Sequence, residues 1–155
     1  MKALLAASAL AAVLLGGAAG CGSRPPASSP PAGERPAIVA DAWARATPAG
    51  ASMGAVYMTL RSAAEDRLIG AKVSPAVAAR AELHQVVTDG RGQMTMRRVE
   101  AIELPAGVPV RLEPGASHLM LVDLARPLVA GDTLKATLRF EKAGNMTVRV
   151  PVRGV

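Results

Sequence analysis

The chain contains only two histidines, and both belong to patterns that also contain methionine. His118 is followed by Leu119 and Met120, and His84 is followed further along by Met94 and Met96. Imidazole nitrogen and thioether sulfur together suit copper, above all Cu(I). Blue copper needs a cysteine thiolate and structural zinc usually needs cysteine or more histidines, but the single cysteine lies near the N-terminus. These residue types therefore favour a Cu(I) site.

The two donors around residue 119 can act together if this segment is a strand. Successive side chains of a strand point to opposite faces, so His118 and Met120 share one face while Leu119 and Leu121 share the other. We expect the leucines to enter the core. The histidine and methionine would then lie side by side toward the outside or a rim of the domain.

A hairpin would bring the other donors together. Strands over 81–88 and 94–99 are separated by Asp89-Gly90-Arg91-Gly92, a strong turn signal because glycine accepts positive φ. His84 can then lie near Met96, although Met94 shares the same strand face and is a possible alternate ligand. A single methionine is more often a flexible core filler, so it is the joint pattern that favours a metal site.

The rest of the chain predicts one all-β domain. Half of its 155 residues are hydrophobic, but Trp, Tyr and Phe occur once each, so the core must be aliphatic. Residues 133–140 alternate apolar and polar side chains, 75–80 suggests one short helical turn, and frequent turns favour a β-sandwich or barrel. The expected strands are 37–44, 53–61, 67–73, 81–88, 94–99, 108–112, 118–124, 133–141 and 146–152.

The N-terminal region predicts export. Residues 1–20 have a basic start, an apolar centre and small residues, as in a signal peptide. Cys21 follows Ala18-Ala19-Gly20 and resembles a lipidated cysteine, whereas ordinary cleavage nearby would leave a free thiol. Residues 21–36 are rich in proline, serine and glycine and predict a tether. The copper-binding β-domain would then be residues 37–155, in the periplasm or cell envelope and anchored to the membrane through Cys21.

Charge adds little about partners. The formal net charge is +6, but the basic residues are scattered and do not interleave with aromatics, so nucleic-acid binding has little support. A positively charged soluble surface is the simplest interpretation, and attraction to anionic lipid or to an acidic partner is the sharper one.

Several segments within residues 37–152 resemble the periplasmic PCu(A)C copper chaperones. The segments are Tyr57-Met58-Thr59-Leu60, Ala81-Glu82-Leu83-His84, Met94-Thr95-Met96-Arg97, Leu104-Pro105-Ala106-Gly107, His118-Leu119-Met120-Leu121 and Thr137-Leu138-Arg139-Phe140-Glu141. The resemblance implies a cupredoxin-like, Greek-key β-fold that binds Cu(I) through His84, Met96, His118 and Met120. It also implies delivery of copper toward the binuclear copper centre of cytochrome c oxidase, alongside Sco-type thiol proteins.

One position departs from that family pattern. Gln85 stands where the pattern often has a methionine after the first histidine, which removes a possible auxiliary thioether. The four expected ligands are otherwise present. Neutral histidine and methionine ligands avoid the strong hold of thiolates, so we expect a copper chaperone, not an enzyme, acting as a monomer. The alternatives are a lipid-anchored envelope or adhesion β-sandwich with structural histidines and methionines, or a copper storage protein.

Overall fold

The computed structural model describes residues 37–154, which contain ten strands and no helix. The predictions of a signal peptide, a lipidated Cys21 and a tether over 21–36 lie outside the described residues. Because residues 37–154 contain no helix, this part of the chain has no helix that could cross a bilayer. The strands are β1 (Ile38–Arg45), β2 (Met53–Arg61), β3 (Asp66–Val73), β4 (Ala78–Thr88), β5 (Met94–Arg98), β6 (Ile102–Leu104), β7 (Val110–Leu112), β8 (His118–Leu124), β9 (Thr133–Phe140) and β10 (Asn145–Arg153).

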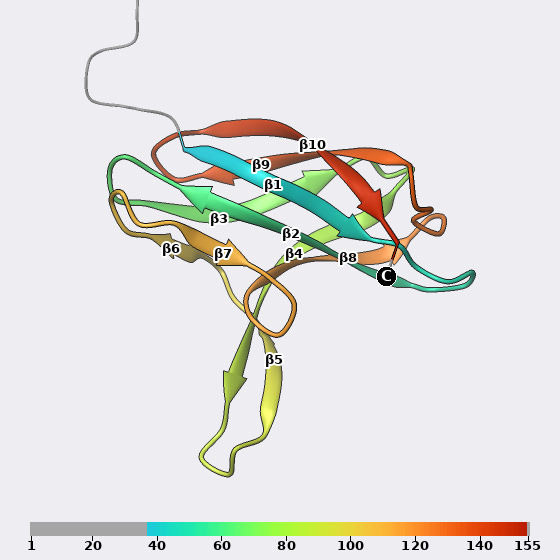
Figure 1. Cartoon of the computed structure of the whole chain (residues 1–155), viewed down its shortest axis with the longest axis horizontal. Coiled ribbons are helices and arrows are strands. Elements are labelled where there is room, and N and C mark those ends of the chain that lie inside the picture. Colours follow the sequence, from blue (N-terminus) through green and yellow to red (C-terminus); the bar gives the residue numbers. More distant parts are fainter. Residues whose placement is uncertain (1–36, 155) are drawn as a thin grey trace, which may run out of the picture.

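The strands form two sheets that enclose one core (Figure 1). One sheet has the order β5-β4-β8-β2-β1, with β7 also paired to β2, and the other has the order β10-β9-β3-β6. A short parallel pairing of β1 with β10 joins them, and the other pairings are antiparallel. The all-β sandwich expected from the sequence is confirmed.

Alternation of side chains builds the core, as β9 illustrates. Leu134, Ala136, Leu138 and Phe140 are buried, and the residues between them face outward or are half-buried. The same rule places Leu119 and Leu121 of β8 in the core, where both are fully buried. Burial of a leucine side chain contributes roughly 1.5–3 kcal/mol, so this largely aliphatic core can hold the sheets together.

Three local features differ from the sequence expectations. Only residues 75–77 of the expected helical turn form a turn, because Ala78 already pairs with Leu124 in the β4–β8 ladder. The strand expected over 108–112 begins only at Val110. Strand β6 was not expected: its three residues are too few to show a period, and pairing with β3 defines it.

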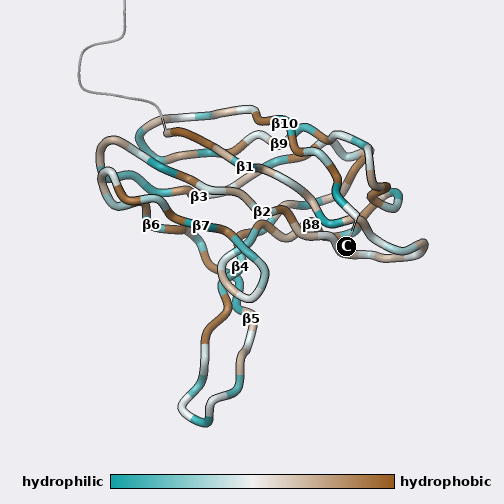
Figure 2. Tube along the Cα trace, viewed as in Figure 1, coloured by the Kyte–Doolittle hydropathy of each residue, from teal (hydrophilic) through white to brown (hydrophobic). Residues whose placement is uncertain are grey.

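The β4–β5 hairpin extends beyond the body of the sandwich (Figure 1). Its turn forms where expected: Gly92 has a φ of 76° and donates to the Asp89 carbonyl, while the Asp89 carboxylate accepts the amides of Arg91 and Gln93. The tip is hydrophilic (Figure 2), and all five residues of β5 are exposed. The candidate ligands lie around the base of this hairpin.

Candidate metal centre

The two histidines face each other across a strand pair. His84 of β4 is directly opposite His118 of β8, and their ring centroids are 5.9 Å apart. Their neighbours Leu83 and Leu119 form the next pair and are buried in the core, so the histidines occupy the other face of the sheet. His118 is nonetheless only 6% exposed, so it is more enclosed than the outward or rim position expected from the sequence.

The methionines lie on either side of the histidine pair. Met120 is opposite Glu82 and is half-buried. It lies one same-face step, which is two residues, along β8 from His118. Met96 is opposite Val86, one same-face step in the other direction along β4. Cross-strand partners project to the same face, so the four predicted ligands share one face. Met120 lies on the sandwich side of the histidine pair, and Met96 lies on the hairpin side.

Met94 lies further from the centre than Met96. The residue of β5 opposite His84 is Arg98, so Met96 is two residues from that level and Met94 is four. At about 3.3 Å per residue these separations are roughly 7 and 13 Å along the strand. The register therefore favours Met96 as the ligand, and Met94 is 67% exposed toward the hairpin tip.

A backbone carbonyl sets the tautomer of His118. Nδ1 of His118 lies 3.0 Å from the carbonyl oxygen of Ala116. A carbonyl can only accept, so Nδ1 must carry the proton and donate it. In the neutral ring Nε2 then keeps its lone pair. This leaves Nε2 as the atom of His118 able to bind a metal ion.

The opposite assignment follows for His84. Nε2 of His84 lies 3.2 Å from Oε2 of Glu82. An ionised carboxylate can only accept a hydrogen bond, so Nε2 carries the proton and donates it. Nδ1 of His84 is buried and has no hydrogen-bond partner among residues 37–154. Buried polar atoms are nearly always paired, so an unpaired nitrogen in this position needs an explanation. A lone pair available for a metal ion supplies one, and a carboxylate behind a ligating histidine is a common supporting contact.

Glu82 is held in its charged form. The hydrogen bond from His84 holds the pKa of Glu82 below its ordinary value; burial opposes this, and the guanidinium groups of Arg98 and Arg80 add to it. Arg80 also contacts Asp123 at 3.0 Å, which helps to fix its position. An ionised Glu82 can only accept, so the tautomer of His84 is maintained.

The single tyrosine and tryptophan lie beside the histidines with their rings tilted relative to one another. The Tyr57 ring is 6.3 Å from that of His118, and Trp43 is 4.7 Å from Tyr57, centroid to centroid. Tyr57 is buried, so it covers one side of His118. The sequence did not predict these contacts, because they depend on the β1–β2 and β2–β8 pairings. The only available indication was that the chain has a single tyrosine.

Other donor sets do not compete in the described region. Residues 37–154 contain no group of three or more histidine, cysteine, aspartate or glutamate side chains suited to a metal. The thioethers of Met96 and Met120 are the further donors on this face, and thioethers suit Cu(I). Gln85 pairs with Arg97, one residue away from the His84 level, so it faces away from the candidate centre. The side chain of a methionine at position 85 would also project from the face opposite to that of His84.

The comparisons with known proteins agree with this fold. The family model described as "Putative lipoprotein LpqE-like" matches residues 38–152. The chain belongs to the LpqE-like family. A curated relative, "Putative lipoprotein Lxx21020" of Leifsonia xyli subsp. xyli (strain CTCB07), is 34% identical over 152 residues, covering 97% of this chain and 90% of the relative.

The solved structures similar to this LpqE-like protein include PCuAC domains. The copper-bound PCuAC domain from PmoF2 has a TM-score of 0.65 and 30% identity, covering 79% of this chain and 96% of the other. The Cu(I) form of DR1885 from Deinococcus radiodurans has a TM-score of 0.59 and 28% identity, with coverages of 79% and 81%. The resemblance to PCu(A)C proteins and the cupredoxin-like fold are both confirmed.

Proposed function

We propose that this LpqE-like protein is an exported, lipid-anchored chaperone that binds one Cu(I) through His84, Met96, His118 and Met120. His84 would bind through Nδ1 and His118 through Nε2, the nitrogens that their hydrogen bonds leave free. The observation that carries the proposal is the Nδ1 of His84, which is buried beside the His118 ring and has no hydrogen-bond partner within residues 37–154. The copper-bound relatives of the same fold support the choice of metal.

The donor set suits transfer better than permanent storage. Four neutral ligands leave the charge of Cu(I) uncompensated and bind less strongly than thiolates. Thioethers also form no disulfides in an oxidising compartment, although oxidation to the sulfoxide would remove them as ligands. Met96 is 56% exposed, so a partner can reach the metal from the hairpin side. We propose that the copper passes toward the binuclear copper centre of cytochrome c oxidase, alongside Sco-type thiol proteins.

The test is a Cu(I) titration of the purified protein under anaerobic conditions against a chromophoric chelator. We expect one Cu(I) per chain, and we expect the double variant H84A/H118A to lose it. A control thioether variant is M146L, because Met146 lies on β10 in the other sheet. Full-strength binding by H84A/H118A would refute the site.

A second measurement separates a chaperone from a storage or envelope protein. The Cu(I)-loaded protein is mixed with the soluble copper-binding domain of the oxidase subunit, and metal is followed after the proteins are separated. Transfer that is faster than release to buffer supports a chaperone. Tight binding without transfer would favour storage, and absence of Cu(I) binding would favour an envelope or adhesion protein.

A further inference from the structure

A groove runs along the flank of the sandwich between β3 and β4. Two hollows of about 330 Å³ each share four lining residues, Ala71, Lys72, Ala81 and Arg98, and therefore form one depression. A third hollow of about 520 Å³ continues from Lys72 toward Lys135. The depression is thus elongated, which suits an extended chain segment better than a single small ion.

The groove is strongly cationic. Its lining includes five basic side chains and one acidic side chain: Lys72, Arg80, Arg98, Lys135 and Arg139 against Glu82. Arg80 is paired with Glu82 and Asp123. The other four basic side chains form no ion pair with any residue of 37–154. An anionic ligand could therefore pair with them without breaking an ion pair within residues 37–154.

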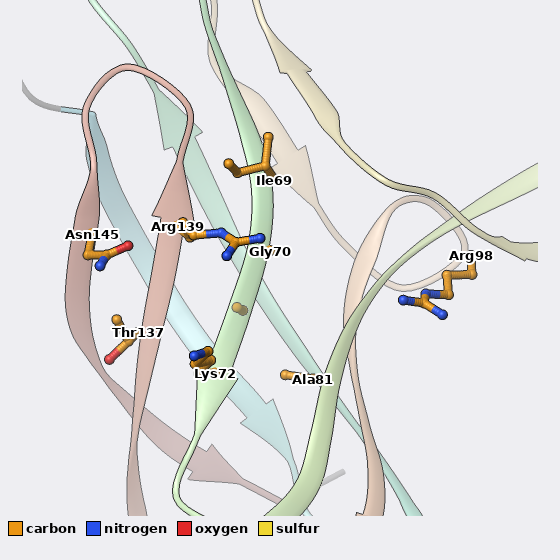
Figure 3. A pocket seen from close by; sticks show the side chains of 9 residues that line it. Ile69, Gly70, Lys72, Ala81, Arg98, Thr137, Arg139 and Asn145 are labelled. Carbon is orange, nitrogen blue, oxygen red and sulfur yellow. The ribbon is translucent and has the colours of Figure 1, made fainter.

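The cations point into the groove from both sides. Figure 3 shows Arg139 extending from β9 across Gly70, with the guanidinium of Arg98 facing it from the other side. Gly70 is the cross-strand partner of Arg139, and a Cβ added to Gly70 would make ordinary contact with Nη2 of Arg139 at 3.7 Å, so the guanidinium lies alongside the backbone of β3. Thr137 and Asn145 also line the groove and offer neutral hydrogen-bonding groups, as a peptide ligand requires.

The groove ends beside the candidate metal centre. Arg98 is the cross-strand partner of His84, and Glu82 both lines the groove and hydrogen-bonds to His84. A segment held in the groove would therefore bring its protein next to the exposed Met96. We propose that the groove docks an acidic, extended segment of the protein that accepts copper, an inference that rests on the proposed function.

The arrangement favours a protein segment over an anionic membrane. A bilayer is flat and meets the most protruding parts of a protein, whereas these cations line an elongated depression. Charge complementarity at such a site raises the association rate and selects partners, and it weakens as salt is added. The contact would therefore bring the acceptor to the copper centre in a defined orientation.

The test measures anisotropy of a short fluorescein-labelled peptide of alternating aspartate and serine, titrated with the purified protein at low salt. We expect the exposed pair K72E/R139E to weaken peptide binding by at least about tenfold, because it replaces two attractive charges with two that repel the peptide. K72Q/R139Q should weaken it less, because it removes charge without reversing it. The matched control is R45E/R149E, which makes the same change in net charge on exposed residues outside the groove.

Each outcome separates the groove from its alternatives. Equal losses in K72E/R139E and R45E/R149E would show an effect of net charge alone and overturn the proposal. Groove-dependent binding to phosphatidylglycerol vesicles without peptide binding would also overturn it. Cu(I) titration of the same variants should remain unchanged. Loss of copper binding by H84A/H118A with peptide binding intact would show that the two sites are independent, and Cu(I) binding without peptide binding would refute only the groove.

Discussion

Glu82 offers the sharpest test of how the candidate centre is built. In the proposed site it is a supporting residue, because its hydrogen bond to Nε2 of His84 would leave Nδ1 for the metal. We predict that E82A weakens Cu(I) binding without changing the stoichiometry. Without the carboxylate, the proton can move to Nδ1, and the ring is no longer held in one orientation.

The magnitude follows from the contact. The Glu82 and His84 side chains are only 19% and 17% exposed, so water screens their 3.2 Å hydrogen bond weakly. A hydrogen bond to a charged group contributes about 1.5–3 kcal/mol. At about 1.4 kcal/mol per factor of ten, this corresponds to roughly 10- to 100-fold in affinity. That range agrees with the effect usually seen when the partner of a ligating histidine is removed.

The assay is chelator competition with Cu(I) at constant pH and salt. E82Q should retain more affinity than E82A, because its amide oxygen can still accept the Nε2 proton. E103A is the control: Glu103 of β6 forms an exposed pair with Arg67, away from the centre. An E82A affinity within about twofold of the unmodified protein would refute the tautomer argument, since it would correspond to under 0.5 kcal/mol.

Three further predictions rest on the β4–β5 register, the contacts of Asp66 and the sequence around Cys21. M96L should lower Cu(I) affinity more than M94L because Met96 is one same-face step nearer to the histidine pair; the reverse ranking in chelator competition would move the ligand to Met94. Burial raises the pKa of Asp66, but hydrogen bonds from the backbone amides of Lys142, Arg67 and Ala143 outweigh this and leave the pKa lowered. Asp66 therefore contributes stability that is complete above its unfolded pKa of about 3.9 and is lost as the pH falls through the lower folded value. D66N should lower the free energy of unfolding by about 3 kcal/mol near neutral pH and flatten the acid side of a denaturation profile. C21A should release the protein from the membrane fraction, and unchanged membrane association would contradict lipidation at Cys21.

Local sequence patterns predicted most of the strands. Alternation identified β9, and the glycines after Asp89 identified the hairpin, because both signals arise from neighbouring residues. The segment 75–80 shows the limit of this reasoning. Its alanines favour a helix, but pairing of Ala78 with Leu124 starts a strand there instead. Tertiary contacts override local propensity in such cases.

The ligand types could be recognised from the sequence, but the supporting contacts could not. His118 and Met120 share a strand face by alternation alone. The pairing of His84 with His118 depends on a β4–β8 register between segments that are distant in the sequence. Glu82 could have been suspected, because it is two residues from His84 on the same strand face. The Ala116 carbonyl had no sequence signal, since any residue offers one.

The four candidate ligands differ in how firmly the fold holds them, and this implies an order of release. His118 is buried, hydrogen-bonded to Ala116 and covered by Tyr57, so a partner cannot reach it first. Met96 lies on a hairpin strand whose residues are all exposed. An incoming thiolate or thioether would therefore displace Met96 first, while the histidines keep the copper in place. The same exposed strand carries Arg98 into the cationic groove, so an acidic segment bound there would place the incoming ligand beside the ligand that leaves first.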